Sequence, residues 1–334
     1  MLSILKWLLA LSVLGALAVA GYAAWYIDSP IRIGTLPVEF EIPPRTGFRA
    51  ATQRIADAGI PVGRVQFELL ARTLGRTQDI KAGSYELTAA PTPLELLDKL
   101  TRGDVTQGEV TFIEGWTFRQ MRAALGASAF LAHDTQAMDD ADVMKALGEP
   151  GIHPEGRFFP DTYLFSRGAS DLQVLRRSRA TMQRHLAREW EARDMNLPYA
   201  SPHEALVMAS IIEKETGDAS ERDRIAGVLL NRIRIGMLLQ ADPTVIYGLG
   251  TKFDGNLRKR DLLEDGPYNT YTRAGFPPTP IAMPGLASLK AALRPATTSA
   301  YYYVARGDGK SEFSRTLEEH NRAVTKYQLQ PRRK

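Results

Sequence analysis

Residues 201–236 read SPHEALVMASIIEKETGDASERDRIAGVLLNRIRIG, and this stretch predicts two helices joined by a short turn. Ser201 is a typical cap, Pro202 suits the first turn, and Glu204 completes a capping box. Gly217 is a typical stop, because glycine readily adopts the left-handed backbone that ends a helix. The first helix is therefore expected to run from about Pro202 to just before Gly217.

The second helix has similar start and stop signals. Ser220 with Asp223 predicts a capped start, and Gly236 follows the end. The apolar residues between them recur at helical spacing. The segment is thus expected to form a helical hairpin with its turn at residues 217–220.

The two glutamates near this turn are not equivalent. The main apolar stripe of the first helix contains Val207, Met208, Ile211 and Ile212. Glu215 falls near the middle of that stripe, whereas Glu213 points to the opposite side of the helix. Glu213 is therefore expected at the surface, or at most as a structural partner.

Glu215 is predicted to have a raised pKa. Burial on an apolar face and the negative end of the helix dipole both disfavour its charged form. A carboxyl group that stays protonated near neutral pH suits a general acid. Helix position alone leaves the alternative of an ion pair with a nearby arginine, because structural ion pairs also perturb pKa values.

Composition limits the classes of function. The chain has 334 residues, enough for two domains, with 44% hydrophobic residues and a net charge of +4. That charge is too small and too dispersed to indicate a nucleic-acid-binding protein. The absence of cysteine excludes disulfides, thiolate zinc sites and cysteine nucleophiles, and the five histidines show no metal-binding spacing.

The N-terminus predicts a membrane anchor. Trp7–Ile27 carries no charge and is about as long as a bilayer-spanning helix, with aromatic residues at both ends. A cleaved signal peptide is the alternative, since Ala18-Val19-Ala20 resembles a cleavage site. An uncleaved anchor would keep residues 1–6 in the cytoplasm, because Lys6 lies on that side.

The remaining chain divides into two predicted parts. Residues 28–37 resemble an exposed linker, and Val38–Gly103 has the pattern of a small mixed α/β unit. This unit is expected either to pack as an accessory domain or to bind a polymer, and sequence physics favours packing. A second, larger α+β unit contains the hairpin and polar loops that include Gln240, Asp242 and Tyr268-Asn-Thr-Tyr271.

Several motifs together resemble one family, the MltG (YceG-like) endolytic murein transglycosylases. They occur in order along nearly the whole chain: Glu155-Gly156, Phe159-Pro-Asp-Thr-Tyr163, Ala209-Ser-Ile-Ile-Glu-Lys-Glu-Thr216, Ala219-Ser-Glu-Arg-Asp223, Asn231-Arg232, Gln240-Ala-Asp-Pro-Thr-Val-Ile-Tyr-Gly248, Tyr268-Asn-Thr-Tyr271, Phe313-Ser314 and Glu319-His-Asn321. The resemblance implies a bacterial inner-membrane protein with a single transmembrane helix (7–27) and a periplasmic catalytic domain. It also implies a LysM-like subdomain at 38–105, a catalytic domain at 106–330 and a basic tail at 331–334.

The resemblance further implies an activity. The expected enzyme is a lytic transglycosylase that cleaves the MurNAc–GlcNAc β-1,4 bond inside nascent peptidoglycan strands and leaves 1,6-anhydro-MurNAc ends. A role in cell wall assembly, including the termination of strand elongation, and membrane-bound peptidoglycan synthases as partners are part of this expectation. No cofactor, metal or nucleic acid is expected.

The resemblance assigns catalysis to Glu215, in agreement with the position of this residue on its helix. Gln240, Asp242, Asn269 and Tyr271 are predicted to hold the sugar and to stabilise positive charge at the anomeric carbon. Asp242 could equally cap a turn. Glu221 is predicted as a structural residue, paired with Arg222 or Arg232. Two rival functions stay open: a muramidase that uses Glu215, Asp242 and water, and an inert glycan-binding scaffold.

Overall fold

The computed structural model describes residues 2–105 and 107–329, so the predicted basic tail at 331–334 lies outside the described residues. The chain forms two compact units. The first contains the chain up to Gly108 together with Leu164–Ala169, and the second contains Glu109–Tyr163 and the chain from Ser170 onwards. The sequence did not indicate that a segment beyond residue 160 joins the first unit. Arg167 in that segment forms an ion pair with Glu39.

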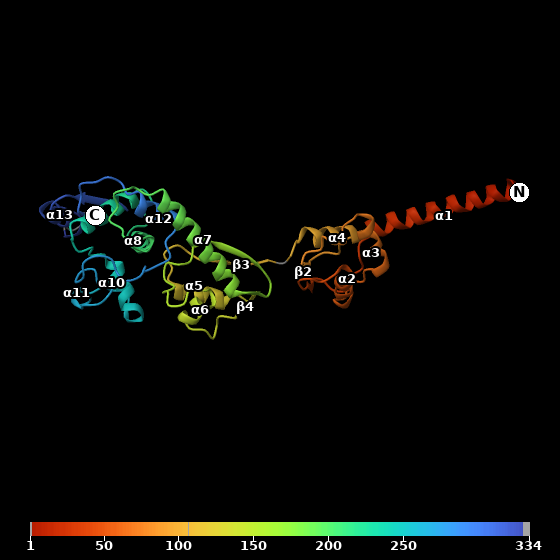
Figure 1. Ribbon diagram of the computed structural model, residues 1–334, viewed down its shortest axis with the longest axis horizontal. Coiled ribbons are helices and arrows are strands. Elements are labelled where there is room, and N and C mark those ends of the chain that lie inside the picture. Colours follow the sequence, from red (N-terminus) through yellow and green to blue (C-terminus); the bar gives the residue numbers. More distant parts are fainter. Residues whose placement is uncertain (1, 106, 330–334) are drawn as a thin grey trace. The chain divides into compact units, whose positions relative to one another are not determined.

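The first unit combines helices and strands, as the pattern of Val38–Gly103 predicts (Figure 1). They are α1 (Leu2–Asp28), β1 (Val38–Ile42), α2 (Phe48–Asp57), α3 (Arg64–Thr73), β2 (Gly83–Leu87) and α4 (Pro93–Arg102). β1 and β2 pair antiparallel, with Phe40 opposite Tyr85, and the two rings stack inside the core. The start of α4 is a complete capping box, in which Thr92 and Glu95 bind each other's backbone amides.

α1 is the one helix within the described residues that is long and apolar enough to cross a membrane. The span Lys6–Asp28 has a mean hydropathy of 1.9, and its apolar window of 18 residues contains no buried residue. Near its C-terminal end, Tyr26 and Ile27 pack against the core of the first unit. The predicted α+β fold class with an N-terminal apolar helix is confirmed.

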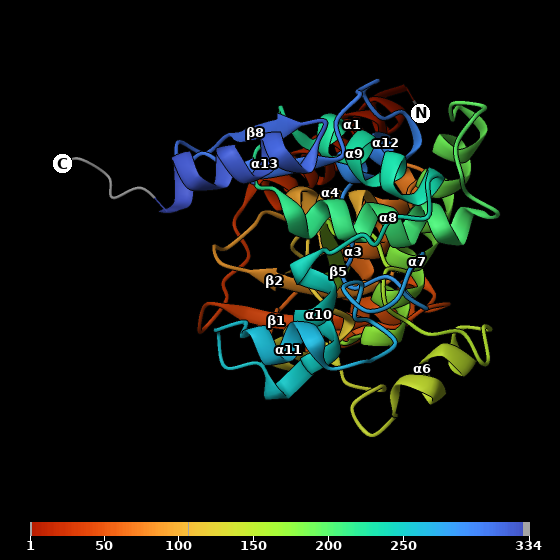
Figure 2. The same cartoon turned by 90° about the vertical axis from the view of Figure 1, so that its left-hand side faces the viewer.

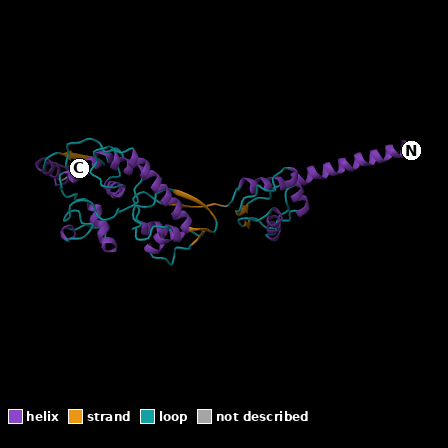
Figure 3. Ribbon diagram, viewed as in Figure 1, coloured by secondary structure: helices purple, strands orange, loops and turns teal. Residues whose placement is uncertain are grey.

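Helices dominate the second unit, and its strands are short (Figure 3). The helices are α5 (Phe118–Ala127), α6 (Asp140–Ala146), α7 (Asp171–Glu191), α8 (Pro202–Glu215), α9 (Arg222–Arg234), α10 (Asp242–Leu249), η1 (Gly250–Lys252), α11 (Lys259–Leu263), α12 (Leu286–Leu293), α13 (Leu317–Val324) and η2 (Thr325–Leu329). The strands are β3 (Gln107–Thr111), β4 (Leu131–Ala132), β5 (Thr162–Ser166), β6 (Ala169–Ser170), β7 (Tyr302–Ala305) and β8 (Ser311–Ser314). Of these, β3, β5 and β6 also contain residues of the first unit. β3 pairs with β5, β4 with β6, and β7 with β8.

α8 is the central helix of the second unit. All of its residues from Ala205 to Ile212 are buried, so it packs on every side rather than along one stripe. It contacts α7, α9, α10 and α12, and Figure 2 shows α8, α9 and α12 lying together. Because Glu215 is the last residue of this helix, it lies where the apolar core ends.

The predicted hairpin of α8 and α9 is present, but its caps differ from those expected. The Ser201 side chain makes no capping hydrogen bond, and Glu204 instead accepts from the Ala200 amide at 2.6 Å. Ser220 donates to Asp218, and α9 starts after Glu221. Both predicted caps were wrong because neighbouring groups compete for the same donors and acceptors.

α9 lies close to the segment that leads from α12 to β7. The Asp223 backbone carbonyl accepts a hydrogen bond from the Ala296 amide at 2.9 Å. The Asn231 side chain donates to the carbonyl oxygens of Thr298 and Ala300. A Cβ atom on Gly227 would lie 2.4 Å from the Ala296 oxygen. Glycine at this position therefore permits the close approach of helix and segment.

Gly227→Ala is expected to lower the free energy of unfolding by about 1–3 kcal/mol, the usual cost of overpacking. This loss should appear even though alanine is the better helix former by about 1 kcal/mol. Gly126→Ala in α5 is the matched control, because no atom lies within 4 Å of the added Cβ. Urea unfolding followed by circular dichroism measures both, and equal stability changes would contradict the close approach.

Candidate active site

Glu215 presents its two carboxyl oxygens to different surroundings. Oε2 accepts a hydrogen bond from Tyr303 Oη at 2.9 Å. Oε1 is buried and has no hydrogen-bond partner within the described residues, although the side chain as a whole is partly exposed. One oxygen is thus fixed by the protein, and the other is left for a further group.

The pKa of Glu215 is raised from its ordinary value of 4.5 to about 7. Burial is the largest cause, and the negative charge of Asp242 acts in the same direction. The hydrogen bond from Tyr303 and the positive charge of Arg232 oppose this shift. The raised pKa predicted from the helix position is therefore present. At neutral pH the carboxyl and carboxylate forms have similar populations, as a group that gives and takes protons requires.

Asp242 and Tyr271 form a second pair beside Glu215. Tyr271 Oη donates to Asp242 Oδ1, and Asp242 is the exposed first residue of α10. Burial raises the pKa of the Tyr271 phenol, and the hydrogen bond to Asp242 raises it further. The charge of Glu215 also raises the pKa of Tyr271, so these groups belong to one electrostatic cluster.

Backbone contacts bring the segments of Gln240 and Tyr271 together. The Gln240 amide donates to the Thr270 carbonyl at 3.0 Å, and the Ala241 amide donates to Thr270 Oγ1 at 3.0 Å. Gln240 has a φ of 51°, a left-handed conformation that is uncommon for this residue type. Such local strain persists only where the surroundings impose it. The exposed Gln240 side chain is therefore held beside Asp242 by the backbone.

Asn269 is buried, and its side chain binds its own loop. Nδ2 donates to the carbonyl oxygens of Asp261, Leu262 and Glu264, and Oδ1 accepts from the Tyr271 amide at 2.8 Å. Both hydrogens of the amide are thus engaged. The geometry makes Asn269 a residue that positions Tyr271.

The sequence did not single out Tyr303, which lies 88 residues after Glu215. In the structure it lies on the strand β7. The β7–β8 pairing places Tyr303 opposite Phe313 and Ala305 opposite Ser311. Only the folded hairpin brings this tyrosine to the end of α8.

Glu221 binds that hairpin. Its Oε1 accepts from the Ser311 amide and its Oε2 from Ser311 Oγ, both at 2.8 Å. The predicted pairing with Arg222 or Arg232 is wrong, because the β8 backbone offers a donor pair that matches the carboxylate. Glu221 is therefore a structural residue, as predicted, but its partner is Ser311 and not an arginine.

Arg232 is buried and connects two segments of the cluster. Its Nε donates to the Tyr301 carbonyl at 2.7 Å, and Nη1 donates to the Leu239 carbonyl at 2.8 Å. The guanidinium lies 5.3 Å from the centroid of the Tyr302 ring. Arg232 therefore joins the start of β7 to the residues before Gln240, and its charge lowers the pKa of Glu215.

Glu213 is not at the surface, so that option of the prediction was wrong. Its Oε2 accepts from the Gly285 amide at 2.9 Å and from Ser288 Oγ at 2.7 Å, at the first turn of α12. A carboxylate at a helix N-terminus is favourable because the amides there lack helical partners. Glu213 is thus the structural partner that the sequence left as its second option.

Glu155 is a second glutamate in this unit whose pKa burial raises to about 7. Both of its oxygens have protein partners: Oε1 accepts from the Phe118 amide and Oε2 from Tyr247 Oη, each at 3.0 Å. It joins α5 to α10. The two glutamates therefore share a raised pKa but differ in their hydrogen bonds, because Oε1 of Glu215 has no partner within the described residues.

Among residues 2–105 and 107–329, no group of three histidine, aspartate or glutamate side chains is arranged to hold a metal ion.

Glu215→Gln should change how stability depends on pH. The folded carboxyl keeps its proton up to about pH 7, whereas its ordinary pKa is 4.5, so the wild type loses stability as pH rises through this window. Glutamine has no proton to lose. The melting temperature of the variant relative to wild type should therefore increase between about pH 4.5 and 7.

Scanning fluorimetry from pH 4 to 8.5 measures this difference. Glu191→Gln, at the exposed end of α7, controls for the loss of one negative charge. A melting-temperature difference that stays constant with pH would contradict the raised pKa of Glu215.

The comparison with known proteins gives a consistent result. The YceG-like family matches residues 40–326. An endolytic murein transglycosylase of Bacillus subtilis is 33% identical over 264 residues, which cover 74% of this chain and 73% of that protein. An endolytic murein transglycosylase of Streptococcus pneumoniae serotype 2 is 25% identical, and the match covers 97% of this chain and 65% of that protein. The 2.6 Å crystal structure of a yceG-like protein from Listeria monocytogenes has a TM-score of 0.55 and 30% identity, over 86% of this chain and 98% of that one.

Proposed function

The chain belongs to the YceG-like family and its enzyme class is that of a lytic transglycosylase; we propose that it cleaves the β-1,4 bond between MurNAc and GlcNAc inside nascent peptidoglycan strands. The observation that carries this proposal is the carboxyl group of Glu215. It has a pKa of about 7, one oxygen held by Tyr303, and one oxygen without a partner within the described residues.

In the first step, protonated Glu215 donates its proton from Oε1 to the glycosidic oxygen. The bond between C1 of MurNAc and this oxygen breaks, and positive charge develops at C1. Tyr303 donates to Oε2 and so stabilises the carboxylate that forms. Because Oε1 is covered in the free protein, contact with the substrate requires a local rearrangement of side chains.

In the second step, the Glu215 carboxylate takes the proton of the MurNAc C6 hydroxyl. The C6 oxygen attacks C1 and closes the 1,6-anhydro ring, which leaves Glu215 protonated for the next cycle. No water is consumed. One carboxyl group therefore serves as acid and then as base, whereas ordinary glycosidases divide these tasks between two carboxyl groups.

The remaining residues have supporting roles in this proposal. The negative charge of Asp242, beside Tyr271, favours positive charge at C1 and helps to keep Glu215 protonated. The exposed amide of Gln240 is suited to sugar hydroxyl groups. Asn269 positions the loop that carries Tyr271. Its side-chain amide does not bind the sugar, because it is already hydrogen-bonded to the backbone of this loop.

A membrane-bound position suits this activity. The apolar helix Lys6–Asp28 would anchor the chain in the inner membrane, with its N-terminus in the cytoplasm and the chain after Asp28 in the periplasm. The first unit, with its β–α–α–β order and antiparallel strands, is proposed to be LysM-like. Partnership with membrane-bound peptidoglycan synthases and the termination of strand elongation belong to the same proposal.

The chemical nature of the products tests the reaction. Full-length wild type should release internal fragments with anhydro-MurNAc ends from peptidoglycan, as measured by mass spectrometry. Glu215→Gln should lose about 10²–10⁴-fold of this activity, the usual contribution of a general acid–base group. Asp242→Asn should be slower but keep the anhydro product.

Two other results would contradict the proposal. Free reducing ends from wild type would identify a hydrolase that uses Asp242 with water. Retained glycan binding without any product would identify a scaffold.

The descending limb of kcat/KM against pH reports the pKa of the acid in the free enzyme. The bond from Tyr303 lowers the pKa of Glu215, so Tyr303→Phe should move this limb to higher pH. Glu221→Gln should move it in the same direction, because the hairpin that carries Tyr303 is loosened.

The double variant should show no larger shift than Tyr303→Phe alone, since both changes break the same contact. Glu312→Gln is the matched control, because it lies on β8 but its carboxylate accepts from Tyr327 instead. Additive shifts, or a shift in the control, would mean that Glu221 does not act through Tyr303.

A further inference from the structure

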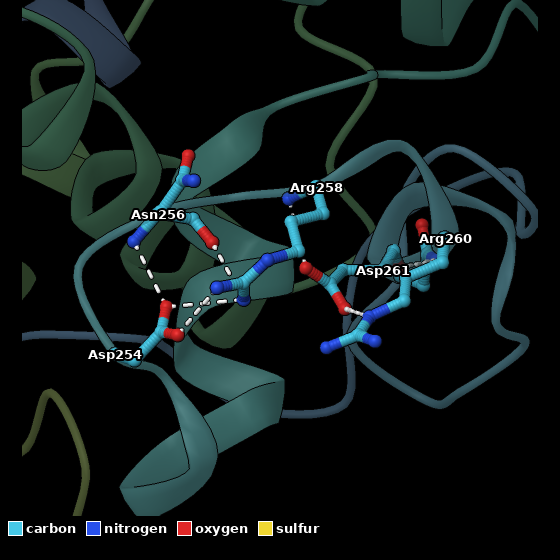
Figure 4. Close-up of polar contacts among 6 residues, drawn as sticks. Asp254, Asn256, Arg258, Arg260 and Asp261 are labelled. Atoms are coloured by element: carbon cyan, nitrogen blue, oxygen red, sulfur yellow. Dashed lines mark hydrogen bonds and ion pairs between the residues drawn. The ribbon is translucent and has the colours of Figure 1, made fainter.

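A hollow of about 190 Å³ lies between the C-terminal end of α10 and α11. Neither Glu215 nor Asp242 lines it. Its wall includes the apolar side chains of Leu249 and Phe253 and charged side chains of both signs (Figure 4). It is therefore separate from the cluster around Glu215.

Some of these charged groups form hydrogen bonds with one another and so stabilise the wall of the hollow. Arg258 donates to Asp254 through Nη2 at 2.6 Å and through Nη1 at 3.1 Å (Figure 4). The Arg258 amide donates to Asp261 at 2.8 Å, which starts α11. These bonds close the loop at residues 254–258 without help from a ligand.

Three other charged groups are available to a ligand. The Arg260 side chain is 76% exposed, and its Nε lies 3.5 Å from Asp261 Oδ1, too far for a strong hydrogen bond. Lys252 and Glu264 are exposed and have no ion-pair partner within the described part of the chain. Two cations and one anion beside an apolar wall match a short peptide with carboxylates, an amine and alkyl side chains.

The distance from the proposed catalytic cluster fits a branch of the substrate. α10 begins at Asp242 and ends at Leu249, and eight helical residues span about 12 Å. An extended peptide covers about 3.3 Å per residue, so three to four residues bridge this distance. A peptide attached to a sugar beside Glu215 would thus reach the hollow.

The hollow is also joined to the cluster by hydrogen bonds. Asn269 binds the carbonyl oxygens of Asp261 and Glu264, which lie in and next to α11, and accepts from the Tyr271 amide. A ligand that contacts α11 therefore contacts a helix that is hydrogen-bonded, through Asn269, to the loop carrying Tyr271.

We propose that this hollow binds the peptide branch that peptidoglycan carries on its MurNAc residues, with Arg260 and Lys252 binding carboxylates and Glu264 binding an amine. This inference rests on the proposed function and adds that the enzyme prefers peptide-bearing strands.

The test compares two substrates for the full-length protein: peptidoglycan strands with their peptides, and the same strands after an amidase has removed them. Wild-type kcat/KM should be about tenfold higher on the peptide-bearing strands, as expected for one charge-assisted hydrogen bond. The double variant Lys252→Gln, Arg260→Gln should lose this preference and keep wild-type activity on the bare strands. Lys259→Gln, exposed on α11 but outside the hollow, is the control.

Two outcomes would overturn the proposal. Equal wild-type activity on both substrates would mean that the peptide is not bound productively, and an equal loss of variant activity on both would mean that Lys252 and Arg260 support the fold. Either result would still leave anhydro-MurNAc ends as evidence for the reaction. Absence of these ends from both substrates would instead mean that the proposed function fails.

Discussion

The complete burial of α8 is the constraint on which the second unit depends. A helix that is apolar on every side must be surrounded, and α7, α9, α10 and α12 supply that surrounding. The residues that follow the buried run attach the neighbouring segments: Glu213 binds the first turn of α12, and Lys214 Nζ donates to the Gly115 carbonyl at 3.3 Å. Glu215 is the next residue and lies at the end of α8, at the edge of the apolar core. Its raised pKa is therefore a consequence of where the apolar helix stops.

The helix α9 positions the β7–β8 hairpin, whose Tyr303 donates a hydrogen bond to Glu215. Close approach at Gly227 and hydrogen bonds from Asn231 align the chain before β7 with this helix. Glu221 then holds β8, and Arg232 holds the start of β7. These contacts hold the Glu215 carboxyl group on α8 and Tyr303 on the β7–β8 hairpin in fixed positions relative to α9.

The electrostatics of the cluster are balanced rather than extreme. Burial and Asp242 favour the protonated carboxyl, while Tyr303 and Arg232 favour the carboxylate. In the proposed reaction Glu215 acts first as an acid and then as a base, and a pKa near the working pH suits this role because neither form is then strongly preferred. Glu155 shows the contrast, since a similar pKa accompanies two engaged oxygens and a structural role. The difference lies in the hydrogen-bond partners of each oxygen.

The sequence by itself determined the helical hairpin of α8 and α9, the apolar N-terminal helix and the position of Glu215 on an apolar face, because these depend on local spacing of side chains. It also singled out the segments of Gln240, Asp242 and Tyr271, but as loops, whereas Asp242 begins the helix α10. The tertiary structure alone decided the partners: Tyr303 for Glu215, Ser311 for Glu221, and α12 for Glu213, which periodicity had allowed at the surface. The caps at Ser201 and Ser220 were mispredicted for a related reason, since competing neighbours decide them. Periodicity reports which face of a helix is apolar, whereas contacts between residues 70–90 positions apart depend on how whole elements pack.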